Sequence, residues 1–146
     1  MTDFILINDK KNLTKLINLD NNKVHVRFEV NHSEFSKVDN INWVIVNGII
    51  DLIQTNINEH KVKAKKFLKF LIENCELYDI ETIERIKDFQ LIAIEIIEPF
   101  GKHPQLKYTN YRLQFDFISD YHVDTYGLLN VMFMDKYAIG VERIFG

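Results

Sequence analysis

The chain has 146 residues, of which 47% are hydrophobic and 12% aromatic, and a formal net charge of −3 at pH 7. This length predicts one domain over residues 1–146, with enough apolar side chains to fold without disulfides or metal ions. The small negative charge gives no overall attraction to nucleic acid. No apolar run in the sequence reaches the roughly 20 residues that a membrane helix needs. With a single cysteine, Cys75, and no signal-peptide pattern, the sequence predicts a cytoplasmic protein.

Residues 4–30 predict strands. Val24, Val26, Phe28 and Val30 alternate with polar side chains, which is the period of a half-buried strand. The Asp-Asn-Asn-Lys sequence at residues 20–23 predicts a turn in front of it. Further upstream, FILI predicts a short strand, whereas LTKLINL fits either a strand or a helical turn.

After residue 40 the apolar spacing becomes helical. The first stripe begins at Trp43 and ends at Ile57, and either Asp39 or Asn40 is available as its N-cap. Gly48 and the β-branched WVIV run disfavour a helix. A strand over residues 42–46 therefore remains an alternative.

A second apolar stripe predicts a helix over residues 62–75. Its buried face is expected to contain Ala64, Phe67, Leu68, Leu71, Ile72 and Cys75. Lys61, Lys65 and Lys69 share a different stripe, which we expect to be exposed. Because cations at a helix N-terminus oppose the macrodipole, either the helix starts earlier, around residues 55–58, or these lysines meet an anionic surface. A short helical turn at residues 80–87 then leads into more strands.

The last third predicts a sheet. Residues 91–97 are apolar at both odd and even positions, which indicates a central strand buried on both faces. Residues 111–117 alternate as a strand with one wet face, and residues 129–141 predict an antiparallel hairpin with its turn at Asp135-Lys136. We therefore predict an α+β fold, in which helices pack on one face of an antiparallel sheet as a single pair of layers.

The sequence offers little that resembles catalytic or metal-binding chemistry. Asp120, His122 and Asp124 alternate and could face a metal together, but a polar loop is the preferred interpretation. The five histidines do not have a metal-ligand spacing, and the serines lack a nucleophile elbow. We therefore predict no catalytic residue, no cofactor and no metal site.

Glu95 interrupts an otherwise apolar run, FQLIAIEII. An unpaired carboxylate in a protein interior is costly. We expect Glu95 either to face an edge of the sheet or to form an ion pair with an arginine of a neighbouring strand, such as Arg112 or Arg143. A functional role for this carboxylate is the alternative.

The sequence predicts a Trp-headed helix and then a second helix ending in FLKFLIEN. They are followed by residues 91–98, residues 111–117 and the closing Tyr126-Gly127 and Gly140-Val141-Glu142-Arg143 segments. This pattern, over about the last two-thirds of the chain, resembles small bacterial α+β proteins of unassigned function, some of which are toxin-immunity proteins. The lysine-, isoleucine- and asparagine-rich composition is also typical of an AT-rich, bacterial genome. The resemblance implies an intracellular protein that binds its partner by surface complementarity.

We therefore predict a non-enzymatic protein-binding domain that occludes a partner protein, such as a toxin, and binds neither nucleic acid nor membrane. The acidic residues Glu76, Glu81 and Glu84 would suit a basic partner, and the basic stripe of Lys61, Lys65 and Lys69 would suit an acidic one. A third candidate is the sheet surface around Arg112, Gln114 and Asp116. The alternative function is a small enzyme or ligand-binding domain with a pocket between sheet and helices, using Asp116, Glu95 or His122.

Overall fold

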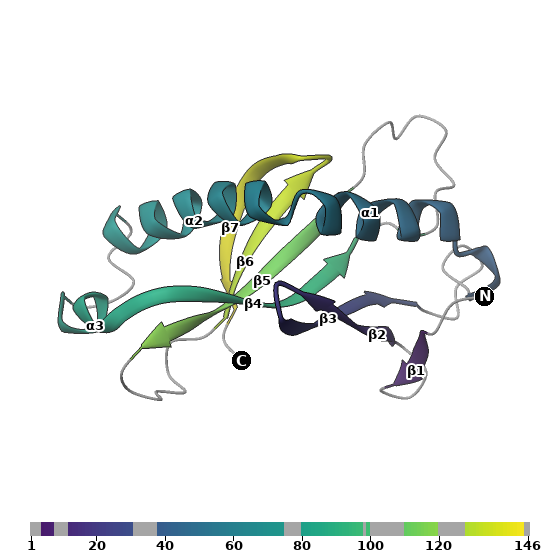
Figure 1. Cartoon of the computed structure of the whole chain (residues 1–146), viewed down its shortest axis with the longest axis horizontal. Coiled ribbons are helices and arrows are strands. Elements are labelled where there is room, and N and C mark those ends of the chain that lie inside the picture. The colour runs from purple at the N-terminus through teal and green to yellow at the C-terminus, as the bar shows by residue number, and fades with distance from the viewer. Residues whose placement is uncertain are drawn as a thin grey trace.

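A computed structural model describes residues 4–7, 12–30, 38–74, 80–97, 99, 110–119 and 128–144. These residues form seven strands, three α-helices and a 3-10 turn at Val38–Asn40 (Figure 1). The strands are β1 (Ile5–Ile7), β2 (Asn12–Leu19), β3 (Asn22–Glu29), β4 (Ile86–Ile96), β5 (Asn110–Ser119), β6 (Leu128–Met134) and β7 (Tyr137–Ile144). The helices are α1 (Trp43–Thr55), α2 (Ile57–Asn74) and α3 (Ile80–Arg85).

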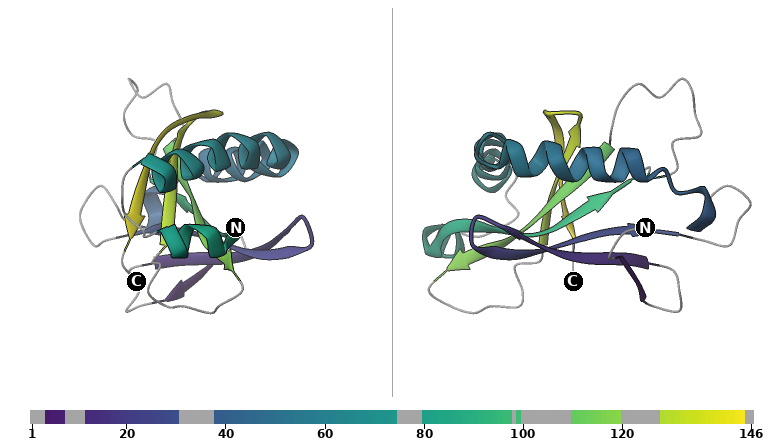
Figure 2. Two further views of the ribbon diagram at one scale, coloured as in Figure 1. Left: turned by 90° about the vertical axis from the view of Figure 1, so that its left-hand side faces the viewer. Right: turned by 45° about the vertical axis from the view of Figure 1, so that its right-hand side comes forward.

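The strands form one sheet in the order β1-β2-β3-β4-β5-β6-β7. Neighbouring strands are antiparallel except for β3 and β4, which are parallel. The parallel pair follows from the helical crossover between these strands, because a parallel pair needs a long connection. The predicted α+β class is confirmed, but the sheet is mixed and larger than the simple pair of layers that we expected. Figure 2 shows how strongly the strand directions rotate from β2 to β7, as sheet twist requires.

Strands β2 and β3 form the N-terminal hairpin, with a tight turn at Asp20 and Asn21. Both residues have positive φ, 51° and 64°. A two-residue turn of this hand matches strand twist, and Asn and Asp tolerate it. The LTKLINL segment is therefore a strand, paired in register with β3 from Leu19↔Asn22 to Asn12↔Glu29.

Helix α1 begins two or three residues later than its expected caps predict. Its N-cap is Asn42, whose side-chain oxygen accepts hydrogen bonds from the backbone N–H groups of Val44 and Ile45 at 3.1 and 3.4 Å. The expected caps Asp39 and Asn40 are wrong, since both lie in the preceding 3-10 turn. The alternative strand at residues 42–46 is wrong as well, because the Asn42 cap and burial of Val46 favour the helix.

Helix α2 starts at Ile57, within the earlier start at residues 55–58 that the helix-dipole argument allowed. Leu68 and Ile72 are buried, and Phe67 and Leu71 pack partly against the same core. The helix contacts β6 and β7 and runs directly on from α1 (Figure 1).

Strand β4 lies between β3 and β5, as expected for a central strand, but it is not simply buried on both faces. Phe89 and Leu91 are buried at odd-numbered positions, and Ile94 and Ile96 are buried at even-numbered positions. A register shift between Leu91 and Ala93 explains both sets, because a bulge reverses which positions face the core. The odd and even apolar residues thus serve one core, and Glu95 is directed away from it.

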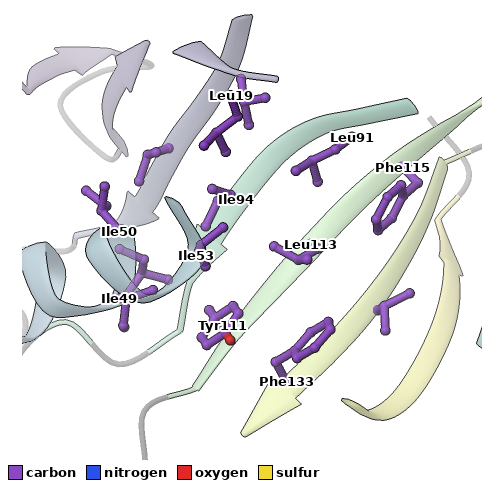
Figure 3. Close-up of a cluster of buried hydrophobic side chains, with 14 of the residues drawn as sticks. Leu19, Ile49, Ile50, Ile53, Leu91, Ile94, Tyr111, Leu113, Phe115 and Phe133 are labelled. Carbon is purple, nitrogen blue, oxygen red and sulfur yellow. The ribbon is translucent and has the colours of Figure 1, made fainter. Parts of the chain in front are cut away.

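Buried side chains of α1 and α2 form one core with buried side chains of the sheet. Figure 3 shows Ile49, Ile50 and Ile53 of α1 directed toward the side chains of β4 and β5. We call the face of the sheet that carries these side chains the core face. The opposite face carries the alternate positions of β3, β5 and β6, and we call it the network face.

Candidate functional site

The network face carries polar side chains that the sheet register places side by side. One row runs across three strands, where Arg27 pairs with Glu95 and Glu95 pairs with Arg112. The next row pairs Gln114 of β5 with Asn130 of β6, and Asn130 with Glu142 of β7. The six residues that make up this network are Arg27, Glu95, Arg112, Gln114, Asn130 and Glu142.

The second row is a relay of side-chain hydrogen bonds across the sheet. Arg27 donates to Gln114 Oε1 at 2.9 Å, Gln114 donates to Asn130 Oδ1 at 3.1 Å, and Asn130 donates to Glu142 Oε1 at 3.2 Å. Each amide thus donates to one neighbour and accepts from the other. Because the donors and acceptors alternate, the orientation of each amide is fixed by its neighbours.

Ion pairs close this relay into a ring. Glu95 lies 3.2 Å from Arg112 and 3.7 Å from Arg27, and Arg112 also lies 3.7 Å from Glu142. The ring contains two cations and two anions, so its formal charges balance. Its arginine and glutamate side chains are each 30–42% exposed, and solvent therefore reaches the charged groups.

The two amides are far more buried than the charges around them. Gln114 is 4% exposed and Asn130 is fully buried. Arg112 Nε is also buried and makes no hydrogen bond. A buried donor without a partner is costly, and this guanidinium therefore has one N–H group that no hydrogen bond satisfies. The network is an ordered polar surface with one unused donor.

Glu95 behaves as a structural ion-pair partner in this arrangement. Of the two expected arginines, Arg112 pairs with it, and Arg27 is a second partner that the sequence did not indicate. Asp116 lies further along β5 on the same face, exposed, and its carboxylate accepts a hydrogen bond from the backbone N–H of Phe117 at 2.8 Å.

The lysine stripe is largely paired within the molecule. Lys61 lies 2.7 Å from Asp20 and Lys65 lies 2.8 Å from Asp88, and both side chains are less than one-third exposed. The expectation that all three lysines are exposed is wrong for these two, because α2 crosses close to the β2–β3 turn and to β4. Lys69 alone is exposed.

The acidic stretch contributes fewer free charges than its sequence indicates. Glu81 pairs with Arg85 at 2.6 Å, one helical turn along α3, and remains largely exposed. Glu84 is exposed too. Glu76 lies outside the described residues, as do Cys75 and the Asp120, His122 and Asp124 segment.

His60 is the side chain that the sequence analysis missed. It is 1% exposed at the start of α2, and burial lowers its pKa. Its spacing with Ala64, Leu68 and Ile72 extends the apolar stripe back by one turn. That helical spacing was the available signal.

Asn130 gave a comparable signal, since it interrupts the apolar LLNVMFM strand as Glu95 interrupts its own. Arg27 gave none, because it occupies a polar position of an alternating strand, and Glu142 gave none, because it stands beside Arg143 outside any apolar run.

The described part of the chain contains no cluster of three or more His, Cys, Asp or Glu side chains able to hold a metal ion. No helix within those same ranges is long and apolar enough to cross a membrane. No protein-family model matches the sequence, and comparisons with curated proteins and with solved structures find no match either.

Proposed function

We propose that the protein is a non-enzymatic binding domain that contacts a partner protein through the network face. The observation that carries this proposal is the closed ring of hydrogen bonds and ion pairs over β3, β4, β5, β6 and β7. In this proposal the helices cover only the core face, so the network face is the one that meets the partner.

An ordered polar surface favours binding for an energetic reason. Immobilising a long side chain at an interface costs about 0.5–1.5 kcal/mol. Arg27, Arg112, Glu95 and Glu142 already hold one another in place, so much of this cost is met during folding. Alternating charges at fixed positions also select partners with the complementary pattern and reject others.

The charged surfaces of α2 and α3 support binding less well. Lys61 and Lys65 are engaged by Asp20 and Asp88, and Glu81 is engaged by Arg85. A partner that used these groups would have to replace existing ion pairs. Lys69 and Glu84 are exposed, but two opposite charges do not define a patch of one sign.

We further propose that the partner is a toxin of the producing cell or of a neighbour, which this protein neutralises by covering its active site in the bacterial cytoplasm. The resemblance of the helix and strand pattern to immunity proteins supports this choice of partner. Occlusion requires no catalytic group on the binding protein, and a preformed surface is sufficient for it.

The rival proposal, a small enzyme or ligand-binding domain, places its pocket between sheet and helices. Glu95 and Asp116 both alternate with core residues and are directed to the network face instead. The third residue, His122, lies outside the described residues. Neither described carboxylate therefore supports a pocket in that position.

A pair of charge reversals tests the proposed surface. The partner is first captured from a bacterial lysate with the tagged protein, and its affinity is then measured for Asp116→Lys and for the control Asp51→Lys. Asp116 lies on the network face, whereas Asp51 is an exposed residue of α1. We expect a loss of affinity of at least about tenfold for Asp116→Lys alone, as for a charge placed wrongly within an interface.

Unchanged binding by a folded Asp116→Lys protein would contradict the proposal. Equal losses in both variants would also contradict it, since the network face would then have no special role. Thermal unfolding of each variant checks that the fold is retained.

A further inference from the structure

His60 is a buried titratable side chain that the proposed binding face does not use. Its ring packs against Tyr111 of β5 and Phe133 of β6, with ring centroids 5.9 and 5.1 Å away. The residue is 1% exposed, and its ring lies between α2 and the core face of the sheet. An imidazole in such a place must satisfy its two nitrogens within the protein.

A chain of polar contacts joins this histidine to the β6–β7 turn. His60 Nδ1 lies 2.8 Å from the carbonyl oxygen of Asn56, and Nε2 lies 2.5 Å from the Tyr111 hydroxyl oxygen. The Tyr111 hydroxyl donates to the carbonyl oxygen of Asp135. Asp135 is the first residue of the turn, so three contacts connect the start of α2 to the tip of the hairpin.

Neutral side chains supply too few protons for these three contacts. A neutral imidazole has one N–H and a tyrosine has one O–H. With the proton on Nδ1, His60 donates to Asn56, and the Tyr111 hydroxyl must choose between Nε2 and Asp135. With the proton on Nε2, the Tyr111 and Asp135 contact is made, but Nδ1 faces an oxygen without a proton between them. Either tautomer leaves one buried contact unmade.

Protonation of His60 would supply the third proton and complete the chain of contacts, but burial opposes this protonation. Loss of hydration is the main cause that lowers the pKa of His60, and Lys63 acts in the same direction. The Asn56 carbonyl and Glu59 act in the opposite direction, although the Glu59 carboxylate is itself 2.9 Å from Lys63. Desolvating a cation costs more than one buried hydrogen bond contributes.

The other charged groups near the chain lie in the turn. Lys136 follows Asp135, and its carbonyl oxygen accepts a hydrogen bond from Lys63 at 3.0 Å. Burial, followed by the charge of Asp135, raises the pKa of Tyr111, which therefore stays protonated and remains a donor. His60 is the member of this chain whose ordinary pKa lies closest to neutral pH.

We propose that His60, Tyr111 and the Asp135 carbonyl form a pH-sensitive latch, which holds the β6–β7 turn against α2 at neutral pH and opens when His60 is protonated. In the closed latch the imidazolium is buried, whereas in the open latch water hydrates it. Protonation therefore favours the open form. The hydrogen bond that the added proton makes in the closed latch offsets only part of this desolvation cost.

The direction of the pH effect follows from the lowered pKa. The stabilising contribution of the latch is fully present above the ordinary histidine pKa of 6.5, and it is lost as pH falls from there through the lowered pKa of the folded protein. Each unit of lowering corresponds to about a tenfold change in the opening equilibrium. This inference does not rest on the proposed partner.

NMR spectroscopy tests the latch on the whole protein. The pKa of His60 is measured from its ring signals, and amide-exchange protection of residues 134–138 is measured from about pH 7.5 to about pH 5.5, the range in which histidine responds. His60→Gln removes the titrating ring, and His25→Gln removes an exposed histidine of β3 as the matched control. We expect protection to fall about tenfold in the wild type and in His25→Gln, but to stay constant in His60→Gln.

A His60 pKa at or above its ordinary value would overturn the proposal, and so would an equal loss of protection in His60→Gln. Should His60→Gln fail to fold, the wild-type titration still decides. The loss of protection must begin near the ordinary histidine pKa of 6.5 and level off near the measured His60 pKa, and a loss outside that pH range would overturn the latch.

Discussion

The side-chain amide of Asn130 joins Gln114 to Glu142 within the network. Its oxygen accepts from Gln114, its nitrogen donates to Glu142, and the residue is fully buried. A buried amide is tolerated only when both of its ends are paired. Asn130 is therefore a structural residue of the network, beneath the charged groups that a partner would touch.

Replacing Asn130 with Ala should lower the free energy of unfolding by about 1–3 kcal/mol, because the Gln114 donor then lies buried without its acceptor. The control is Asn18→Ala on β2, where the side chain is exposed and the change should stay within about 0.5 kcal/mol. Urea unfolding followed by circular dichroism measures both values. Equal effects of the two substitutions would show that the amide relay contributes nothing to stability.

At the scale of residues, the sequence shows which polar residues interrupt an apolar run, but it does not show which side chains pair with them. Glu95 was recognised from its apolar surroundings, and an arginine partner on β5 was expected. Arg27 was not, because β3 and β4 are parallel neighbours only through a crossover of more than fifty residues. His60 was missed because lysines surround it in sequence, although its helical spacing places it in the core.

At the scale of elements, α2 shows why position within a stripe matters for energy. Leu68 is fully buried, whereas Leu71 packs at the edge of the core and Phe70 is 63% exposed. Both leucines were expected on the packed face of the helix, and Leu68 lies at its centre whereas Leu71 lies at its edge. The buried row of α2 runs through His60, Ala64, Leu68 and Ile72, and Leu71 lies beside that row.

Leu68→Ala should cost about 2–5 kcal/mol of unfolding free energy, as truncation of a buried leucine leaves a cavity. Leu71→Ala should cost less, and Phe70→Ala should change stability by at most about 0.5 kcal/mol because its ring is already in water. Denaturant titrations of the three variants rank these costs. A cost for Leu68→Ala no larger than that for Phe70→Ala would contradict the packing of α2.

The strands were predicted better than their mutual arrangement. Alternation located β3 and β5, and the Asp135-Lys136 turn located the last hairpin, because both signals are local. The choice between strand and helical turn for β2 needed its pairing with β3. The apolar run of β4 was misread, since a bulge and a second buried face give the same sequence pattern.

At the scale of the whole molecule, the network face arises only when strands β3 to β7 are assembled in register. Its members come from five strands, and residues 27 and 142 lie at opposite ends of the sequence. No local pattern carries that information. The surface around Arg112, Gln114 and Asp116 was nevertheless among the predicted candidates, because β5 alone shows a polar face by alternation.

The central claim is that a partner protein covers the network face, and the side-chain amide signals of Gln114 and Asn130 report on it most directly. Side-chain NH₂ groups give their own NMR signals, and these two lie within the ring of hydrogen bonds. Titration with the captured partner should shift both signals and the Arg112 Nε–H signal, while the exposed backbone of α1 stays unchanged. Shifts confined to α2 and α3, around Lys69 and Glu84, with unchanged Gln114 and Asn130 signals would contradict the account.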